Sequence, residues 1–323
     1  MCDQGVGRAA EPLALHYVAI QGGWGTMETD ELVESRHFLS RIGVWPNPKR
    51  LDVEGWLGNF DEGDDTDLAK ALLESHAHID EAQIEYAVYS SIRALSSRDE
   101  FGPAESRQEA WRVFLDNVTV SFPLGRAGDA TASGYIFARI ASRLGFPEGR
   151  ILDTEHLIGA LLKGPARKVI ILDDMSGSGT QFTRDWKRNY VTPHGKSSLK
   201  ALAESGQLQR VYFIPTVCTA TAMQRIQQEC GVVVSPTYVL DSDYHALDAN
   251  SRLVPATQRP RVAEFIEKYG SAASDEDGAD EDGATGFGGL GLAISFHHGC
   301  PNNTLPVLQW GEPSESWSPL VRN

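Results

Sequence analysis

The sequence predicts an α/β protein with a mostly parallel, twisted sheet that follows a helical region. Two observations carry this prediction. From Val113 onward, short apolar runs alternate with helix-like segments, and parallel strands need such helical crossovers. The run Val169–Leu172 is apolar at every position, as expected of a strand that is buried on both faces.

Composition narrows the class of protein. The chain has 323 residues, 41% of them apolar, and a formal charge of −15 from 29 basic and 44 acidic residues. Such a surface repels nucleic-acid phosphates and acidic membranes, so we expect neither direct duplex binding nor membrane attachment. The four cysteines form no CxxC pair and match no zinc spacing, which favours free thiols in a reducing cytoplasm. No apolar run is long enough for a transmembrane helix.

The elements are expected in a fixed order. Helices are predicted within residues 51–98, where Asp80 and Gln83 have the spacing of a capping box. The later strands and helices alternate, and the expected segments are Val118–Phe122, Ser133–Leu144, Val169–Leu172, Thr180–Tyr190, Val211–Ile214, Ala220–Glu229, Val232–Val234, Val262–Tyr269 and Leu292–His297. This order divides the chain into an extension (residues 1–50), a helical region (51–110) and an α/β domain (111–323).

Two segments fall outside this pattern. Residues 271–285 contain six acidic residues between Asp275 and Asp282, among Gly and Ala, and we expect them to be disordered because they offer nothing to bury. Residues 1–26 show no clear period. They are either an extension upstream of a true start at Met27 or an ordered strand around Leu13–Ile20.

A single strand–loop–helix carries the strongest indication of chemistry. The strand Val169–Leu172 leads into Asp173 and Asp174, and the small residues Ser176–Thr180 precede a helix. Open α/β folds bind ligands at this carboxyl edge of the sheet. Glycines and a helix N-terminus turn backbone N–H groups toward an anion, while adjacent carboxylates accept hydrogen bonds from ribose hydroxyls or approach them through Mg²⁺. A plain strand-ending turn in another Rossmann-like protein is the alternative.

This segment resembles the ribose-phosphate loop of type I phosphoribosyltransferases, whose fold is Rossmann-like. The resemblance implies that Asp173 and Asp174 face the ribose hydroxyls and that the 5′-phosphate lies against the loop, with Mg²⁺ as the accompanying ion. The implied loop residues are Ser176, Gly177, Ser178, Gly179, Thr180 and Gln181. Two features depart from the family pattern. Gln181 replaces the usual hydroxyl residue, and the upstream stretch 153–168 resembles a helix and a turn more than a mobile catalytic loop.

Two further segments extend the resemblance to residues 51–323. Gly125-Arg126-Ala127-Gly128-Asp129, followed by Ser133-Gly134, corresponds to the pyrophosphate loop of the type I fold. The strings His297–Pro306 and Trp317–Arg322 are similar to those of the phosphoribosyltransferase-like effector proteins of bacterial conflict systems. That resemblance implies an effector of anti-phage defence that works with a partner protein. In the first string, Asn302 and Asn303 either contact a base or satisfy the backbone of their own loop.

The expected function is binding of a nucleotide or phosphoribosyl compound, with turnover as a transferase. No general base is assigned. A non-catalytic module that senses a nucleotide and signals through a partner is the first alternative, and a nucleotide hydrolase is the second. Other polar groups have simpler explanations: Thr219 as a helix cap, Cys218 as a buried thiol, and His297, His298 and Cys300 as an incomplete metal site.

Overall fold

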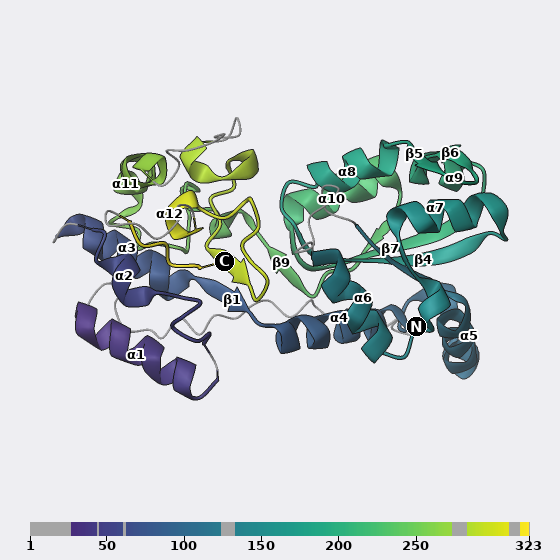
Figure 1. Cartoon of the computed structure of the whole chain (residues 1–323), viewed down its shortest axis with the longest axis horizontal. Helices are drawn as coiled ribbons and strands as arrows, with labels where there is room; N and C mark the ends of the chain where they lie inside the picture. The colour runs from purple at the N-terminus through teal and green to yellow at the C-terminus, as the bar shows by residue number, and fades with distance from the viewer. Residues whose placement is uncertain are drawn as a thin grey trace, which may run out of the picture.

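The computed structural model describes residues 27–43, 45–60, 63–123, 133–272, 283–309 and 317–322. These residues form two lobes, which lie on the left and right of Figure 1. The right lobe contains the main sheet, and the left lobe is built from both ends of the chain. No helix in the described ranges is long and apolar enough to cross a membrane.

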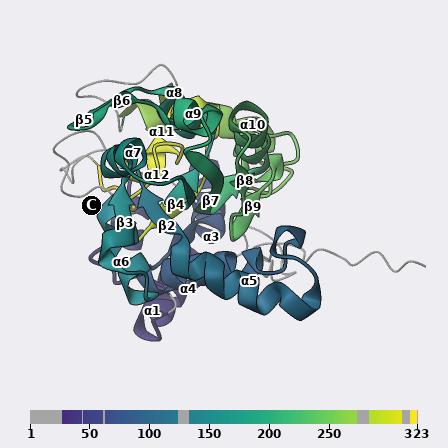
Figure 2. The ribbon, with the colours of Figure 1, turned by 90° about the vertical axis from the view of Figure 1, so that its right-hand side faces the viewer.

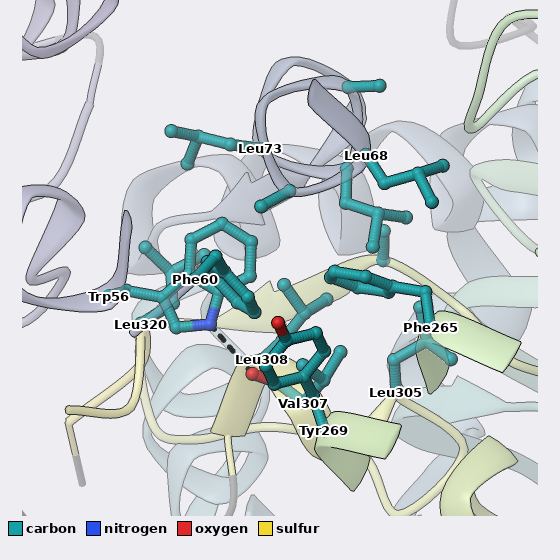
Figure 3. Packing of buried hydrophobic residues seen from close by; sticks show 14 of the residues in the cluster. Trp56, Phe60, Leu68, Leu73, Phe265, Tyr269, Leu305, Val307, Leu308 and Leu320 are labelled. Carbon is teal, nitrogen blue, oxygen red and sulfur yellow. Dashed lines mark hydrogen bonds between the residues drawn. The ribbon is translucent and has the colours of Figure 1, made fainter. Parts of the chain in front are cut away.

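The left lobe combines N-terminal and C-terminal helices around one apolar core. Its helices are α1 (Thr29–Arg41), α2 (Val53–Leu57), α3 (Asp64–Ser75), α11 (Arg259–Ala272) and α12 (Pro306–Gln309). Trp56 of α2 is fully buried, and its indole N–H donates to the Val307 carbonyl at 2.7 Å (Figure 3). Phe60, Phe265 and Leu320 pack in the same core. The last residues of the chain therefore complete the core that the first helices begin.

A short parallel pair of strands connects the two lobes. Strand β1 (Ala77–Ile79) pairs with β10 (Ile294–Phe296), and the two strands lie more than two hundred residues apart in the sequence. The sequence predicts a helical region here, and β1 interrupts it. Three residues are too few to produce a recognisable alternation, so only the distant partner strand identifies this one.

The main sheet confirms the α/β prediction. Its strands are β2 (Thr119–Phe122), β3 (Ile151–Asp153), β4 (Arg167–Ser176), β7 (Leu208–Thr219), β8 (Val233–Val234) and β9 (Tyr238–Leu240). The order is β3-β2-β4-β7-β8, β9 also pairs with β7, and every pairing is parallel. A separate antiparallel hairpin joins β5 (Tyr190–Thr192) and β6 (Gly195–Ser197).

Helices cover both faces of this sheet (Figure 2). One face carries α4 (Glu81–Leu95), α5 (Ala104–Asn117) and α6 (Ser133–Arg143), and the other carries α7 (Thr154–Lys163), α8 (Thr180–Lys187), α9 (Leu199–Glu204) and α10 (Ala220–Cys230). The side chains of β4 alternate between the two cores, with Ile170 in one and Ile171 in the other, because successive strand residues point to opposite faces. The predicted capping box at Asp80 and Gln83 is present at the start of α4.

Both ends of the stretch 271–285, which the sequence predicts to be disordered, form helix. Helix α11 continues to Ala272, and a 3-10 helix resumes at Gly283–Thr285. The reason is local packing: a Cβ on Gly270 would lie 2.8 Å from the Cβ of Ala284, so the missing side chain makes room for the returning chain. Residues 273–282, like residues 1–26, lie outside the described residues.

Candidate functional site

The candidate site begins where β4 loses one of its neighbours. Strand β2 pairs with β4 only as far as Ile171, whereas β7 continues alongside it to Ser176. Asp173 and Asp174 therefore lie on a stretch of β4 that has no pairing with β2 among the described residues. The backbone N–H of Asp174 donates to Asp173 Oδ1 at 3.0 Å. The two carboxylates thus stand at the carboxyl edge of the sheet, as the sequence predicts.

The environment of Asp173 favours its protonated form. Burial and the neighbouring charge of Asp174 raise the pKa of Asp173 well above its usual range. Two adjacent carboxylates in a poorly hydrated place cannot both ionise at low cost. A protonated Asp173 has an O–H to donate, so this pair can both donate to and accept from a sugar hydroxyl.

Asp174 is held by groups from two parts of the chain. Its Oδ1 accepts from the Met175 N–H at 2.6 Å, and its Oδ2 lies 2.7 Å from Nε2 of His298. The His298 ring stacks on Phe296 with 5.5 Å between ring centroids. Its Nδ1 is buried and has no hydrogen-bond partner within the described ranges. The turn after β10 therefore brings an imidazole to the carboxylate pair.

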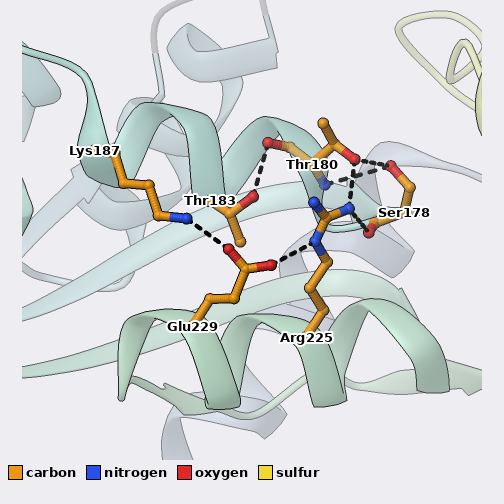
Figure 4. Close-up of polar contacts among 6 residues, drawn as sticks. All are labelled: Ser178, Thr180, Thr183, Lys187, Arg225 and Glu229. Atoms are coloured by element: carbon orange, nitrogen blue, oxygen red, sulfur yellow. Dashed lines mark hydrogen bonds and ion pairs between the residues drawn. The ribbon is translucent and has the colours of Figure 1, made fainter.

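The loop after β4 is organised around the hydroxyl of Thr180 (Figure 4). Ser178 Oγ donates to Thr180 Oγ1 at 3.0 Å, and Arg225 Nη1 of α10 donates to the same oxygen at 2.8 Å. Because both acceptor positions of Thr180 Oγ1 are taken, its hydrogen is left to donate outward. Arg225 also donates to the Ser178 carbonyl at 3.3 Å, which places a cation beside the loop. A donor hydroxyl, a helix N-terminus and a guanidinium suit an anion.

The two glycines of the loop have different structural roles. Gly179 has φ +72°, a conformation that favours glycine, and a Cβ there would lie 3.3 Å from Ala222 and Ile226 of α10. A side chain at this position would therefore press against helix α10. A Cβ on Gly177 would lie 2.3 Å from Asn303 Oδ1, so this glycine permits a close approach by the C-terminal segment.

The C-terminal segment lies over the loop. Asn303 is buried, contacts Gly177, and donates from Nδ2 to the Phe287 carbonyl at 2.7 Å. The side chain of Asn303 therefore satisfies a backbone carbonyl, which is one of the two roles predicted for it. The side chain of Asn302 is exposed. Thr219, the last residue of β7, caps α10, and its Oγ1 also donates to the Gly177 carbonyl at 2.5 Å. Segments on both sides thus fix the loop.

The remaining predicted residues lie elsewhere or outside the description. Gln181 is exposed on α8. Gly134 packs α6 on β2, since a Cβ there would lie 2.5 Å from the Pro123 carbonyl oxygen. Ser133 begins α6, and its side chain is not among the described parts. Gly125 and Arg126 fall in residues 124–132, outside the described residues, so their predicted contact with pyrophosphate stays a prediction.

Sequence analysis did not find Arg225. It lies in an ordinary amphipathic helix, and its position matters only because β4 and β7 are neighbours, which places α8 beside α10. Cys218 is a buried thiol, as predicted. Burial raises the pKa of Cys218 to about 12 and also raises the pKa of Cys300, so neither is a ready nucleophile.

The carboxylate pair does not form a complete cation site by itself. Among the described residues, no group of three His, Cys, Asp or Glu side chains could hold a metal ion. Mg²⁺ usually keeps waters and shares its ligands with substrate phosphates. Asp173 and Asp174 therefore fit an ion that arrives with the oxygens of a ligand, rather than a resident ion.

Solved structures with some similarity include two phosphoribosyltransferases. Orotate phosphoribosyltransferase from Aeropyrum pernix is 13% identical with a TM-score of 0.26, over 48% of this chain and 72% of that one. HGPRT-ase from Leishmania tarentolae in complex with GMP is 9% identical with a TM-score of 0.29, over 50% and 80%. A hypothetical protein from Neisseria gonorrhoeae with bound ppGpp is 11% identical with a TM-score of 0.30, over 58% and 97%. Values at this level support no transfer of activity.

No curated protein matches the sequence. A family model does: the PRTase-CE model matches residues 53–323, from the start of α2 to the last residue. The matched range includes the carboxylate pair, the loop and the C-terminal segment that lies over it. The chain therefore belongs to the PRTase-CE family.

Proposed function

We propose that this phosphoribosyltransferase-like protein binds a nucleotide or phosphoribosyl compound across the carboxyl end of β4 and acts on it. The observation that carries the proposal is the arrangement around Thr180. Ser178 and Arg225 both donate to its hydroxyl oxygen, so the hydroxyl hydrogen is left to donate to a ligand. Only a short loop separates Thr180 from Asp173 and Asp174 in the sequence. In this arrangement the 5′-phosphate lies at the loop, and the ribose hydroxyls lie at the carboxylates.

The side chains supply binding and positioning for this ligand. Asp173 and Asp174 lie side by side at the end of the strand, so the two hydroxyls of a ribose diol can each meet a carboxyl group. Mg²⁺ carried by the ligand would be held partly by this pair, and it would supply neutralisation of pyrophosphate charge. Arg225 provides the cation that the loop itself lacks. Fixing the ribose and its phosphate in this way lowers the entropic part of a transfer barrier.

Hydrolysis of a nucleotide is the second candidate, and the contact between His298 and Asp174 favours it. In a His–carboxylate pair the carboxylate holds one ring nitrogen and leaves the other to take a proton. Here Nε2 is held by Asp174, and Nδ1 has no hydrogen-bond partner in the described part of the chain. Water would then take the place of the nucleobase that accepts the phosphoribosyl group in a transfer reaction. A sensing role without turnover is the outcome if neither reaction occurs.

The cellular role we propose is that of an effector in bacterial anti-phage defence, activated through a partner protein. Support for this comes from the family-like strings His297–Pro306 and Trp317–Arg322, and the structure adds that the first of them contacts Asp174 and Gly177. A partner that moves this segment would change access to the loop. Phage plaque counts for cells that express the wild type or the double variant Asp173→Asn/Asp174→Asn, with the neighbouring genes present, test this role.

Calorimetry with 5-phosphoribosyl 1-pyrophosphate and with GMP, each with Mg²⁺, tests the biochemical proposal. We expect the double variant Asp173→Asn/Asp174→Asn to bind 5-phosphoribosyl 1-pyrophosphate at least tenfold more weakly while still unfolding cooperatively. Product analysis then separates transfer, which needs an added base, from hydrolysis, which does not. Equal affinities of wild type and variant for both compounds would remove the carboxylates from the site and overturn the proposal.

A further inference from the structure

A second candidate binding site lies at the opposite end of the same sheet. A cavity of about 630 Å³ opens at the amino ends of β2, β4 and β7, and residues of helix α5 form part of its lining. It shares no lining residue with the loop that follows β4. Ligand pockets for molecules of nucleotide size commonly occupy ~300–1,000 Å³. The cavity is therefore large enough for a small organic molecule.

One wall of the cavity is apolar and partly aromatic. Phe114 and Val113 of α5 line it together with Phe101. Phe101 and Phe114 are in edge contact, 5.1 Å between ring centroids, and are only 4% and 5% exposed, so they contribute a small, fixed part of the wall. Val113 belongs to the same wall and is 47% exposed. A flat apolar ring would cover this wall well.

The other wall is cationic and incompletely paired. Arg150, Arg167 and Lys168 line it. Arg150 Nη1 and Arg167 Nε are both buried and have no hydrogen-bond partner among the residues that the structure describes. Arg167 does donate from Nη1 to Thr119 Oγ1 at 3.2 Å, and this contact fixes its direction. Both arginines line the cavity, so an anion inside it would lie beside two guanidinium charges.

The one carboxylate in the lining is already engaged. Glu100 contacts Arg98 at 3.3 Å and Arg210 at 3.1 Å. It therefore does not neutralise the cations on the facing wall. In a chain with a formal charge of −15, a cavity lined by three cations and one shared acid is a local exception, and it attracts anions.

We infer that this cavity binds a small organic anion with a flat ring, of the size of a mononucleotide. The ring lies against Phe101 and Phe114, and the anionic group lies against Arg150 and Arg167, whose planar forks suit phosphate or carboxylate oxygens. The inference does not depend on the proposed function. Strand β4 passes between the two sites, with Arg167 at its start and Asp173 six residues later, about 20 Å along the strand.

Calorimetry with GMP in the Asp173→Asn/Asp174→Asn background isolates the cavity from the first site. We expect GMP to bind this protein and Arg150→Gln with Arg167→Gln to weaken that binding at least tenfold. Arg112→Gln, an exposed residue of the same helix α5 outside the cavity, removes one charge and should change nothing. GMP should also slow amide hydrogen exchange in Ala104–Asn117.

The alternatives are distinguishable. Melting curves show whether the arginine variants still fold, and Lys168→Gln, with its exposed side chain, gives a milder variant of the same wall if they do not. GMP binding that survives both the arginine changes and Lys168→Gln, or no GMP binding at all in the background protein, would overturn the inference. Inorganic phosphate binding as tightly as GMP would also overturn it, because the apolar wall would then contribute nothing.

Discussion

Nε2 of His298 lies 2.7 Å from Oδ2 of Asp174, and this contact joins residues 124 positions apart. It ties the turn after β10 to the open end of β4. A ligand that uses Asp174 must share this oxygen with His298 or displace the imidazole. The pair thus connects the C-terminal segment directly to the proposed chemistry.

The first prediction separates a role in turnover from a role in binding. If His298 accepts a proton from water, His298→Ala should lower kcat for nucleotide hydrolysis by about a hundredfold or more while GMP affinity changes little. His297→Ala is the matched control, because the contact that joins His297 to β1 is made by its backbone N–H, to the Ile79 carbonyl at 2.9 Å. An unchanged kcat for His298→Ala, in a protein that does hydrolyse nucleotides, would rule out this role.

The second prediction concerns the stability cost of Asp173. Because its pKa is raised in the folded protein, the folded state binds a proton more tightly than the unfolded state. This contribution is fully present below the pKa of the unfolded carboxyl, near 4, and is lost as pH rises through the folded pKa, at about 1.4 kcal/mol per unit. Asp173→Asn should therefore unfold at a higher temperature than the wild type at pH 8, with the difference shrinking toward pH 4. A variant that is less stable than the wild type at pH 8 would contradict this.

The third prediction concerns two histidines at β1. Burial lowers the pKa of His76 to about 3 and of His78 to about 4. Unfolding lets each ring take a proton below about pH 6.5, so stability is complete above that pH and falls as the solution is acidified toward pH 3. His76→Phe should flatten this decline in urea titrations between pH 6.5 and 4. His156→Gln, which changes an exposed ring, is the control, and an equally steep decline in His76→Phe would contradict the prediction.

The fourth prediction uses two cations that share one carboxylate. Arg225 and Lys187 both contact Glu229, at 2.9 and 2.6 Å, but only Arg225 also contacts the loop (Figure 4). Arg225→Gln should weaken binding of a phosphorylated ribose compound by about 1.5–3 kcal/mol, the range for hydrogen bonds to charged groups. Lys187→Gln removes the same charge and should leave affinity nearly unchanged. Equal losses in the two variants would show a general charge effect instead of a loop contact.

The fifth prediction tests the composite core of the left lobe. Leu320 is fully buried beside residues from α2 and α12. Leu320→Ala should lower the free energy of unfolding by about 2–5 kcal/mol, as buried leucines commonly do. Leu247→Ala, at a leucine that is 47% exposed, is the control in the same chemical denaturation experiment. A loss below 1 kcal/mol for Leu320→Ala would mean that the C-terminal residues contribute little to this core.

Local sequence predicted the central strands of the right lobe, but not the short strands β3, β5 and β6 or the helix α9. The apolar run before Asp173 was predicted to be a buried strand. Its residues Val169–Ile171 pair with β2 on one side and β7 on the other, and all four residues are buried. Hydrophobic period and capping residues are local properties, so Asp80, Gln83 and Thr219 were also interpreted correctly. The capping role of Thr219 followed from its place before a helix, with no knowledge of the sheet.

Long-range relationships were not predicted. β1 has three residues and no period of its own, and its partner Ile294–Phe296 lies at the other end of the chain. Arg225 and His298 reach the site only through the order of strands and through that same distant pairing. A single sequence carries no record of which distant segments meet. The sequence therefore predicted helices of the left lobe one by one, but not that they assemble into a lobe with the C-terminal segment.

The pairing of β1 with β10 has a consequence for the order of events during synthesis. His78 and Ser295, whose side chains meet at 2.9 Å, are 217 residues apart, so the ribosome must add most of the chain before this contact can form. Domains generally fold as units while synthesis proceeds, and contacts between distant residues form slowly. The helices α1–α3 emerge first but wait for α11, α12 and Leu320 to cover their apolar faces. We therefore expect nascent chains that stop before β10 to recruit chaperones through α1–α3, and ribosome profiling of chaperone-bound nascent chains would detect this.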